Sequence, residues 1–162
     1  MSTSGDKSPE QSRVEMTQMV LPGDANSLGT AFGGKIMQWI DVAAAVAARR
    51  HTGGVAVTAS MDSLIFHRPI RLGDVVVLRA SVNRVWRTSM EVGVRVEYES
   101  DSDQTPQHAA SAYLTFVAID ARGKPRATPT LWPRTEEQQR RYREAEHRRL
   151  RRLEDKQSMT ER

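Results

Sequence analysis

Cysteine is absent from the 162 residues of this chain. The absence excludes disulfides, thiolate-bound metals and cysteine nucleophiles, and it suits a reducing compartment, so we expect a cytoplasmic protein. Long apolar runs are missing too. The most apolar stretch, residues 36–48, contains Gln38 and Asp41 and is shorter than the roughly 20 residues that a membrane span needs. Met1 to Arg13 is polar and lacks the apolar segment of a secretory signal.

Several well-known catalytic motifs are lacking as well. There is no Gly-x-Ser-x-Gly elbow, which argues against a serine hydrolase, and no Walker or dinucleotide fingerprint. The histidines are too widely separated for metal-ligand spacing; they are His51, His67, His108 and His147. We therefore expect neither a metal nor a resident cofactor.

The net charge of +4 suggests nucleic-acid binding, but the charge is unevenly placed. Much of it follows Arg134, in a run that is also rich in Glu. The acidic residues dilute the basic field, and no aromatic stacking platform accompanies the run. An anionic small molecule is at least as good a ligand as a polynucleotide, and the sequence argues against a nucleic-acid partner.

Hydrophobic periodicity predicts one helix and several strands. A strand is expected over Val14 to Leu21, and three- and four-residue spacing predicts a helix over Gly33 to Arg50, apolar all round after Val42 as if buried on every side. The period then changes to two, predicting strands over 57–66, 74–86, 89–99 and 109–119. Short loops between the later strands imply antiparallel pairing, so we expect a two-layer α+β domain whose sheet curls around the helix.

Composition divides the chain into three parts. Residues 1–12 are small and polar and predict a disordered tail. Residues 13–133 carry the predicted folded domain. Residues 134–162 are charged and helix-prone, with few apolar side chains, which predicts a solvated helix or a partly disordered tail.

Asp41 is a lone carboxylate on the apolar helix. Its helical neighbours at four and seven residues include Met37 and Ala48, so it shares a face with apolar side chains. Burial raises the pKa of a carboxylate and makes it a better general base for water. The alternative is that Asp41 lies at a helix edge, solvated or bonded to Arg or Ser. The residues alone leave both open.

Four segments in order resemble the acyl-CoA hydrolase family of hotdog-fold thioesterases. They are LPGDANSLGTAFGGKIMQWIDVAAAVAARRH, VTASMDSLIFHRPIRLGD, RTSMEV and LTFVAIDARGKPRATP, within residues 14 to 133. The resemblance implies the hotdog fold, a curved antiparallel sheet wrapped around one long central helix. It also implies a homodimer, commonly assembled further as a trimer of dimers, with active sites at the dimer interface.

In this family pattern, Asp41 matches the catalytic Asp, and Asn26 matches a second active-site residue that serves the Asp of the other chain. An Asn amide holds a water or a carbonyl, although Asn in a Gly/Pro/Asp segment also suits an ordinary turn. Gly33 and Gly34 sit at the expected helix start, where free backbone N–H groups suit a thioester oxygen. The alternative for this Gly pair is close packing of helix and strand.

The resemblance also implies contacts with coenzyme A, which belongs to the substrate and product. Arg87, Thr88 and Ser89 match a segment near bound CoA, and Thr58 and Ser60 lie where relatives line the pantetheine path. By themselves these are ordinary hairpin and strand residues. Trp86 departs from the pattern, since members usually have Gly there, and a bulky indole is expected to affect the CoA entry or the acyl tunnel.

The resulting hypothesis is hydrolysis of acyl-CoA thioesters to free fatty acid and CoA. Asp41 either activates a water or attacks the carbonyl itself to give an anhydride, and the sequence leaves both routes open. The competing hypothesis is a non-catalytic hotdog domain that binds acyl-CoA as a sensor or regulator. Loss of Asp41 or Asn26 would favour that reading, but both residues are present.

Overall fold

The structure, a computed structural model, describes residues 5–161. Along the chain it contains η1 (Pro9–Gln11), β1 (Val14–Met19), η2 (Pro22–Asp24), α1 (Gly33–Thr52), β2 (Ala56–Met61), β3 (Ile65–Phe66), β4 (Val75–Val85), β5 (Ser89–Glu99), β6 (Gln107–Ala118) and α2 (Glu136–Thr160). The single strand predicted over residues 57–66 is wrong, because β2 and β3 pair separately with β6. A register shift after Thr58 and the polar residues Asp62 and Ser63 interrupt it.

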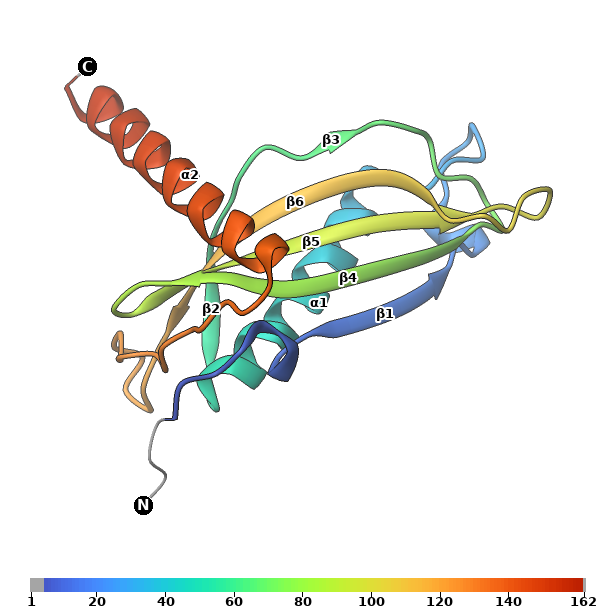
Figure 1. Cartoon of the computed structure of the whole chain (residues 1–162). Helices are drawn as coiled ribbons and strands as arrows, with labels where there is room; N and C mark the ends of the chain where they lie inside the picture. The colour runs from blue at the N-terminus through green and yellow to red at the C-terminus, as the bar shows by residue number, and fades with distance from the viewer. Residues whose placement is uncertain (1–4, 162) are drawn as a thin grey trace.

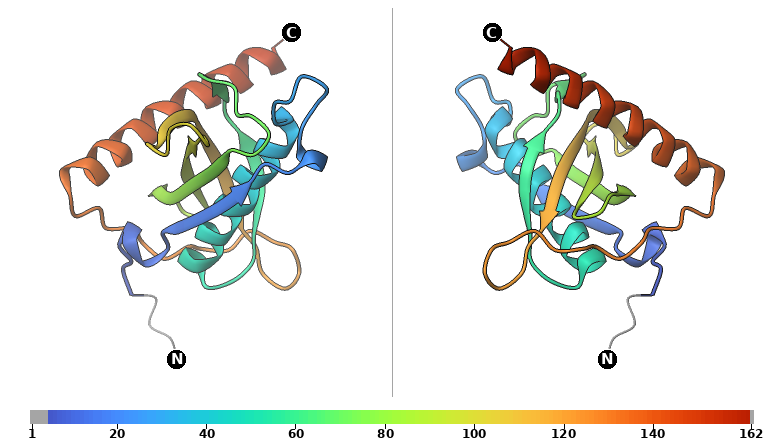
Figure 2. Two further views of the ribbon diagram at one scale, coloured as in Figure 1. Left: turned by 90° about the vertical axis from the view of Figure 1, so that its right-hand side faces the viewer. Right: turned by 90° about the vertical axis from the view of Figure 1, so that its left-hand side faces the viewer.

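The strands form an antiparallel sheet in the order β1-β4-β5-β6-β2, with β3 also on β6. The sheet curls around α1, while α2 crosses its outer face (Figures 1 and 2). Strand alternation explains the two faces. In β5, Met90, Val92 and Val94 turn toward α1 and are buried. The expected α+β fold, a curved antiparallel sheet wrapped around one long helix, is confirmed.

Small side chains bring α1 close to the sheet. Its buried side contains Ile36, Ile40 and the alanines Ala43, Ala44, Ala47 and Ala48, all at most 1% exposed. The expectation that the helix is buried on every side is wrong for the single chain. Met37, Val42 and Val46 are 43%, 47% and 37% exposed, so one side of α1 faces away from its own sheet and is apolar. A helix that is apolar all round can be buried in the core of its own chain, or it can leave one apolar side uncovered, and the sequence alone does not distinguish the two.

The N-terminal segment packs against the end of α1, where composition had predicted disorder. Residues 9–11 form η1, and Ser12 is buried. The Lys7 ammonium donates to the carbonyls of Arg50 and His51 at 3.0 and 2.9 Å. Cations stabilise the carbonyl end of a helix. Sequence periodicity could not predict this contact, because its two acceptors lie 43 and 44 residues away. The part of the predicted tail in residues 1–4 lies outside the described residues.

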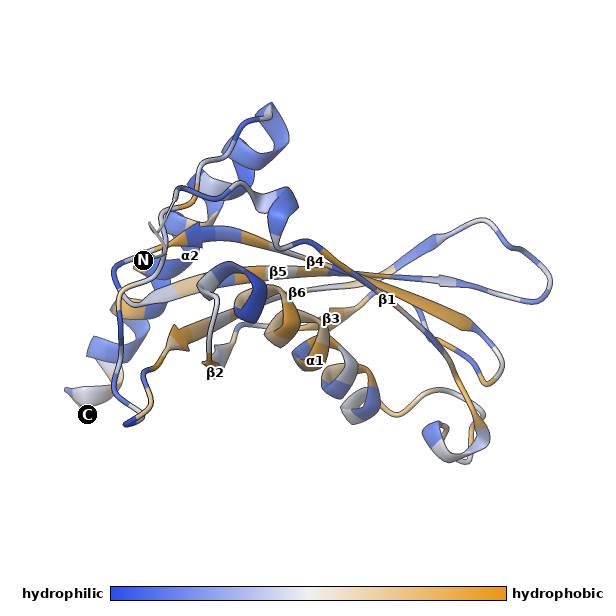
Figure 3. Cartoon of the chain, turned by 90° about the horizontal axis from the view of Figure 1, so that it is seen from below, coloured by the Kyte–Doolittle hydropathy of each residue, from blue (hydrophilic) through white to orange (hydrophobic). Residues whose placement is uncertain are grey.

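The C-terminal helix α2 docks on the sheet through polar contacts. Thr135 and Gln138 form a capping box at its start. The Arg148 guanidinium binds the fully buried Glu91 carboxylate at 2.7 Å, and Asn83 also donates to Glu91, at 3.0 Å. Arg148 lies 3.7 Å above the Tyr113 ring. The helix is mostly hydrophilic (Figure 3), which explains why its sequence suggested a solvated or partly disordered segment.

His51, fully buried near the end of α1, predicts a pH dependence of stability. Its Nε2 lies 2.9 Å from the Pro129 carbonyl. Burial, opposed by that hydrogen bond and assisted by the Lys7 charge, lowers the pKa of His51. Between this lowered pKa and the usual value of about 6.5, the unfolded chain binds a proton that the folded chain does not. We therefore expect the free energy of unfolding to fall as the pH drops below about 6.5.

Urea unfolding across this pH range measures the effect, with His51→Gln as the control, because Gln does not titrate. The variant should lose less stability on acidification than the wild type. Equal pH dependence in the two proteins would contradict a neutral, buried His51.

Candidate active site

Asp41 lies at the edge of the buried side of α1, next to strand β2 of its own sheet. Its carboxylate is half-buried, and the Thr58 hydroxyl of β2 donates to Oδ1 at 2.7 Å. Of the two readings that the residues leave open, the single chain shows the helix-edge one, because Asp41 is bonded to the Thr58 hydroxyl and sits beside the exposed Val42. The hydrogen bond fixes the carboxylate next to an apolar, uncovered surface. Such a group is placed to act on a molecule bound against that surface.

Asn26 lies in the loop between β1 and α1 and is bound within that loop. Its Oδ1 accepts from the N–H groups of Leu28 at 3.0 Å and Thr30 at 3.2 Å, and its Nδ2 donates to Thr30 Oγ1 at 2.9 Å. This is the side-chain turn chemistry expected of Asn. An amide nitrogen carries two donors, so one N–H remains for another acceptor. The loop holds the amide rigidly.

Gly33 and Gly34 begin α1, as predicted. The preceding Phe32 has no polar side chain to cap the helix, and the first N–H groups of a helix lack intrahelical partners. Among the described residues, no heavy atom lies within 4 Å of a Cβ built on Gly34, other than its chain neighbours and the backbone of its own helix. The helix start is therefore open and carries positive potential from the helix dipole. A partly charged oxygen suits this position.

The predicted residues do not meet at one point in a single chain. Gly33 and Asp41 are both on α1, so at 1.5 Å per residue they are about 12 Å apart along the axis. Reacting atoms must approach to roughly 3–3.5 Å. Asn26 and the glycines thus lie at one end of the helix and Asp41 with Thr58 further along it.

The residues expected to contact CoA fall into two groups. Thr58 and Ser60 are on β2, at an edge of the sheet, where Thr58 is already engaged with Asp41. Arg87, Thr88 and Ser89 belong to the tight connection between β4 and β5, in which the Trp86 N–H donates to the Ser89 carbonyl at 2.8 Å. The Arg87 side chain is exposed. The two groups lie on different elements, and a common ligand for them remains a prediction.

Trp86 packs against α2. Its indole N–H donates to Glu146 at 2.9 Å, and the Arg149 guanidinium lies 4.5 Å above its ring. The sequence did not indicate this role, because the partners are 60 and 63 residues away. The indole thus ties the β4–β5 connection to α2.

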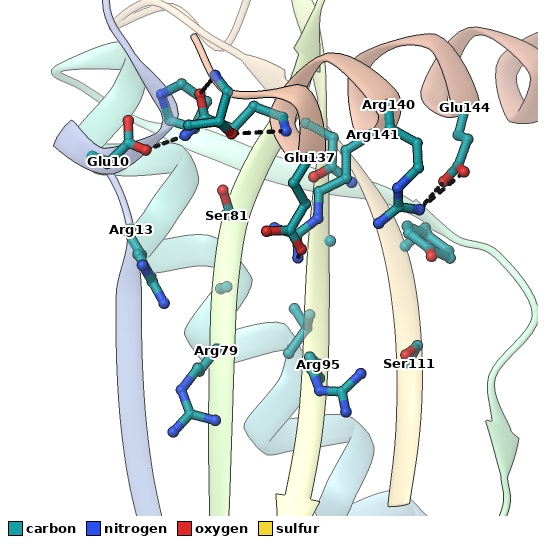
Figure 4. Close-up of a pocket in the computed structure, with 18 of the residues that line it drawn as sticks. Glu10, Arg13, Arg79, Ser81, Arg95, Ser111, Glu137, Arg140, Arg141 and Glu144 are labelled. Atoms are coloured by element: carbon teal, nitrogen blue, oxygen red, sulfur yellow. Dashed lines mark hydrogen bonds and ion pairs between the residues drawn. The ribbon is translucent and has the colours of Figure 1, made fainter. Parts of the chain in front are cut away.

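A groove of about 620 Å³ lies between α2, η1 and the outer face of the sheet (Figure 4). Its charged side chains largely pair with one another, as in Arg140–Glu144 at 3.0 Å and Arg141–Glu137 at 2.6 Å. A hydrogen bond from Arg95, opposed by burial and joined by one from Arg79, lowers the pKa of Glu97. None of the residues predicted to be functional lines this groove. Its size alone does not make it the reaction site.

Possible metal ligands are scattered over the part of the chain that the structure describes. Among residues 5–161, no three His, Asp or Glu side chains gather closely enough to hold an ion. His67 and His108 have ring centroids 5.2 Å apart, but they form a pair on their own. Across the same residues, no helix is both long and apolar enough to cross a membrane.

A curved antiparallel sheet around one long helix, with a carboxylate at the edge of that helix, fits the class of hotdog thioesterases. The sequence pattern of the thioesterase superfamily matches residues 28–104. The Bacillus subtilis uncharacterized acyl-CoA thioester hydrolase YkhA is 44% identical over 129 residues, covering 80% of this chain and 75% of that protein. The chain belongs to the acyl-CoA hydrolase family, and the resemblance described above is confirmed.

Other relatives extend the match. Mouse acyl-coenzyme A thioesterase 11 is 40% identical over 91% of this chain, which spans 25% of that longer protein. The Staphylococcus aureus acyl-CoA hydrolase, solved in complex with butyryl coenzyme A, is 37% identical with a TM-score of 0.85, covering 95% of this chain and 96% of that one. The Staphylococcus enzyme was also solved with an Asn, an Asp or a Thr replaced by Ala. Those three residues have the same sequence spacing as Asn26, Asp41 and Thr58.

Proposed function

We propose that the protein hydrolyses acyl-CoA thioesters to the free acid and CoA, at a site completed by a second copy of the chain. The observation that carries this proposal is the Asp41 carboxylate, held by Thr58 at 2.7 Å beside an uncovered apolar surface. In a member of the acyl-CoA hydrolase family, this is a carboxylate fixed for attack on a bound thioester. The butyryl-CoA complex of the Staphylococcus aureus relative supports the substrate class.

Two chains are needed because the groups of one chain are too far apart. Gly33 and Asp41 are separated by about 12 Å along α1, whereas one thioester requires its oxygen donors and its attacking group within a few ångströms. An antiparallel meeting of two α1 helices solves this problem. The start of one helix, with Asn26, then lies beside Asp41 of the other, and a twofold axis makes two identical sites.

The exposed side of α1 supports this pairing. Met37, Val42 and Val46 are apolar and uncovered, as are Val55 and Val57 at the neighbouring β2 edge. Apolar surface of this extent on the helix that carries Asp41 suits a dimer interface. We propose a homodimer as the active unit. We also propose that three such dimers assemble further, and a thioesterase solved as a hexamer, with 40% identity and a TM-score of 0.89, supports a higher assembly.

The chemistry follows from these positions. The N–H groups of Gly33 and Gly34, with the free N–H of Asn26, receive the thioester oxygen as negative charge builds on it. Asp41 of the other chain either takes a proton from water as that water attacks the carbonyl carbon, or attacks this carbon itself. In both routes the C–S bond breaks and the CoA thiolate leaves. In the second route, water then hydrolyses the anhydride and restores Asp41.

CoA itself is bound as part of the substrate, without a separate cofactor. Ser60 on β2 and the exposed Arg87, with Thr88 and Ser89, supply hydroxyl and guanidinium donors for pantetheine and phosphate oxygens. Thr58, which holds the Asp41 carboxylate, lies beside Ser60 on β2, and this places the thioester and the pantetheine next to one another along the strand. Together with Thr58, these four residues are the proposed contacts for CoA.

Mixing two inactive variants tests the shared site. Asn26→Ala and Asp41→Asn each remove one half of it and should each be almost inactive in a CoA-release assay with butyryl-CoA. When both variants are co-expressed, random pairing makes half of the dimers mixed. Each mixed dimer has one intact site, so we expect about a quarter of wild-type activity.

The matched control is co-expression of Asp41→Asn with Thr58→Val. Both of these changes affect the same half of the site, so a mixed dimer has no intact site. Its activity should not exceed the average of the two variants measured alone. Failure of the first pair to regain activity would overturn the shared site. Absence of CoA release by the wild type from any acyl-CoA would overturn the proposed hydrolysis.

A further inference from the structure

An apolar hollow of about 320 Å³ opens beside the first turn of α1. Ile36 and Ile70, 1% and 4% exposed, form its floor. The Phe66 side chain, on the short strand β3, stands at its rim and is 43% exposed. Hydrophobic walls with a few polar groups at the edge are typical of small-molecule sites. No sequence pattern indicates this hollow, because its walls come from the helix start and from a two-residue strand.

The hollow adjoins the proposed oxygen-binding groups on two sides. Gly33 lines it, and a Cβ built on Gly33 would lie 3.8 Å from the Phe66 ring. Thr30 also lines it and is hydrogen-bonded to the Asn26 amide at 2.9 Å. In a thioester the acyl chain is bonded directly to the carbonyl carbon. When the carbonyl oxygen lies at Gly33 and Asn26, the chain therefore starts next to this opening.

We infer that this hollow holds the acyl chain of the substrate, and that Phe66 limits the length of chain that the enzyme accepts. The inference rests on the proposed hydrolysis and names the part of the substrate that the neighbouring residues select. A methylene group occupies roughly the volume of a water molecule, about 30 Å³, so the hollow of about 320 Å³ holds about ten carbons. Short- and medium-chain acyl groups fit inside it, and a palmitoyl chain has to extend past Phe66.

Phe66 variants test this inference with a panel of saturated acyl-CoAs from butyryl to palmitoyl. In Phe66→Ala the rim opens, and kcat/KM for lauroyl- and palmitoyl-CoA should rise about tenfold relative to butyryl-CoA, because one or two methylenes are worth that factor in an apolar pocket. In Phe66→Trp the larger ring fills the hollow, and the preference should move toward butyryl-CoA. The effect should appear in the ratio of kcat/KM between long and short acyl-CoAs, while the inhibition constant of free CoA stays unchanged.

Ile65→Ala is the matched control. Ile65 is the other residue of β3, 62% exposed, does not line the hollow, and points to the opposite face of the strand. It should leave the chain-length profile as in the wild type, and thermal unfolding should show all three variants folded. An active wild type whose profile is the same in Phe66→Ala and Phe66→Trp would overturn the inference while leaving the hydrolysis intact. A wild type inactive on every acyl-CoA would overturn both.

Discussion

Replacing Asp41 with Asn should lower kcat for acyl-CoA hydrolysis by about 10²–10⁴-fold, the usual contribution of a positioned base. Asn has the shape of Asp and keeps an oxygen for the Thr58 hydroxyl, which donates to Asp41 at 2.7 Å. It neither accepts a proton from water at neutral pH nor attacks a carbonyl as a carboxylate does. CoA release under saturating substrate measures kcat, and thermal unfolding should be close to that of the wild type.

Thr58→Val distinguishes the orientation of the Asp41 carboxylate from its chemical role in the reaction. The substitution removes the hydrogen bond to Asp41 but leaves the carboxylate, so we expect a loss of about tenfold, well below that of Asp41→Asn. Nearly full activity in Asp41→Asn would exclude Asp41 from the reaction. It would also revive the sensor hypothesis for this side of α1 if acyl-CoA still bound.

Arg148→Met should destabilise the protein by about 3–5 kcal/mol, because it leaves a buried carboxylate without its cation. Glu91 is fully buried and receives Arg148 in three hydrogen bonds of 2.7 to 3.3 Å. Burial lowers the pKa of Arg148, but its hydrogen bonds and ion pair with Glu91 outweigh this and raise the pKa overall. Urea unfolding at one fixed protein concentration measures the change, since assembly contributes to stability.

Two further variants make this result specific to the ion pair. Arg149→Met, on the same helix, removes a cation above Trp86 and should cost only about 0.5–1 kcal/mol. Adding Glu91→Gln to Arg148→Met removes the stranded charge but keeps an acceptor for Asn83, and should restore most of the stability. Equal losses in Arg148→Met and Arg149→Met would show that the pair is not what holds α2.

Periodicity predicted the helix and most strands because burial of one face leaves a spacing in the sequence. It did not predict the docking of α2 or the packing of Lys7. Lys7 donates to backbone carbonyls 43 and 44 positions away, and α2 is held by ion pairs such as Arg148–Glu91 and Arg152–Asp62, which are 57 and 90 positions apart. No spacing rule applies to such contacts. It also missed the split between β2 and β3, which depends on pairing with β6.

For the candidate site, the sequence predicted which residues take part but not the distances between them. Asp41 was identifiable as a lone carboxylate, and Asn26 and the glycines through the family pattern. Their separation in one chain follows only from their places on α1. The apolar hollow beside Gly33 was not predictable, because Phe66 and Ile36 look like any other apolar residues of a strand and a helix.

The four alanines on the buried side of α1 have a consequence for how the protein tolerates substitution. Their methyl groups set the spacing between helix and sheet, and Asp41 and Thr58 sit across that same spacing. A larger side chain at Ala44 or Ala48 costs about 1–3 kcal/mol through overpacking and moves the helix outward. The Asp41 carboxylate would then move away from the Thr58 hydroxyl. Substitutions at these alanines should therefore lower activity as well as stability, although the alanines take no part in the reaction.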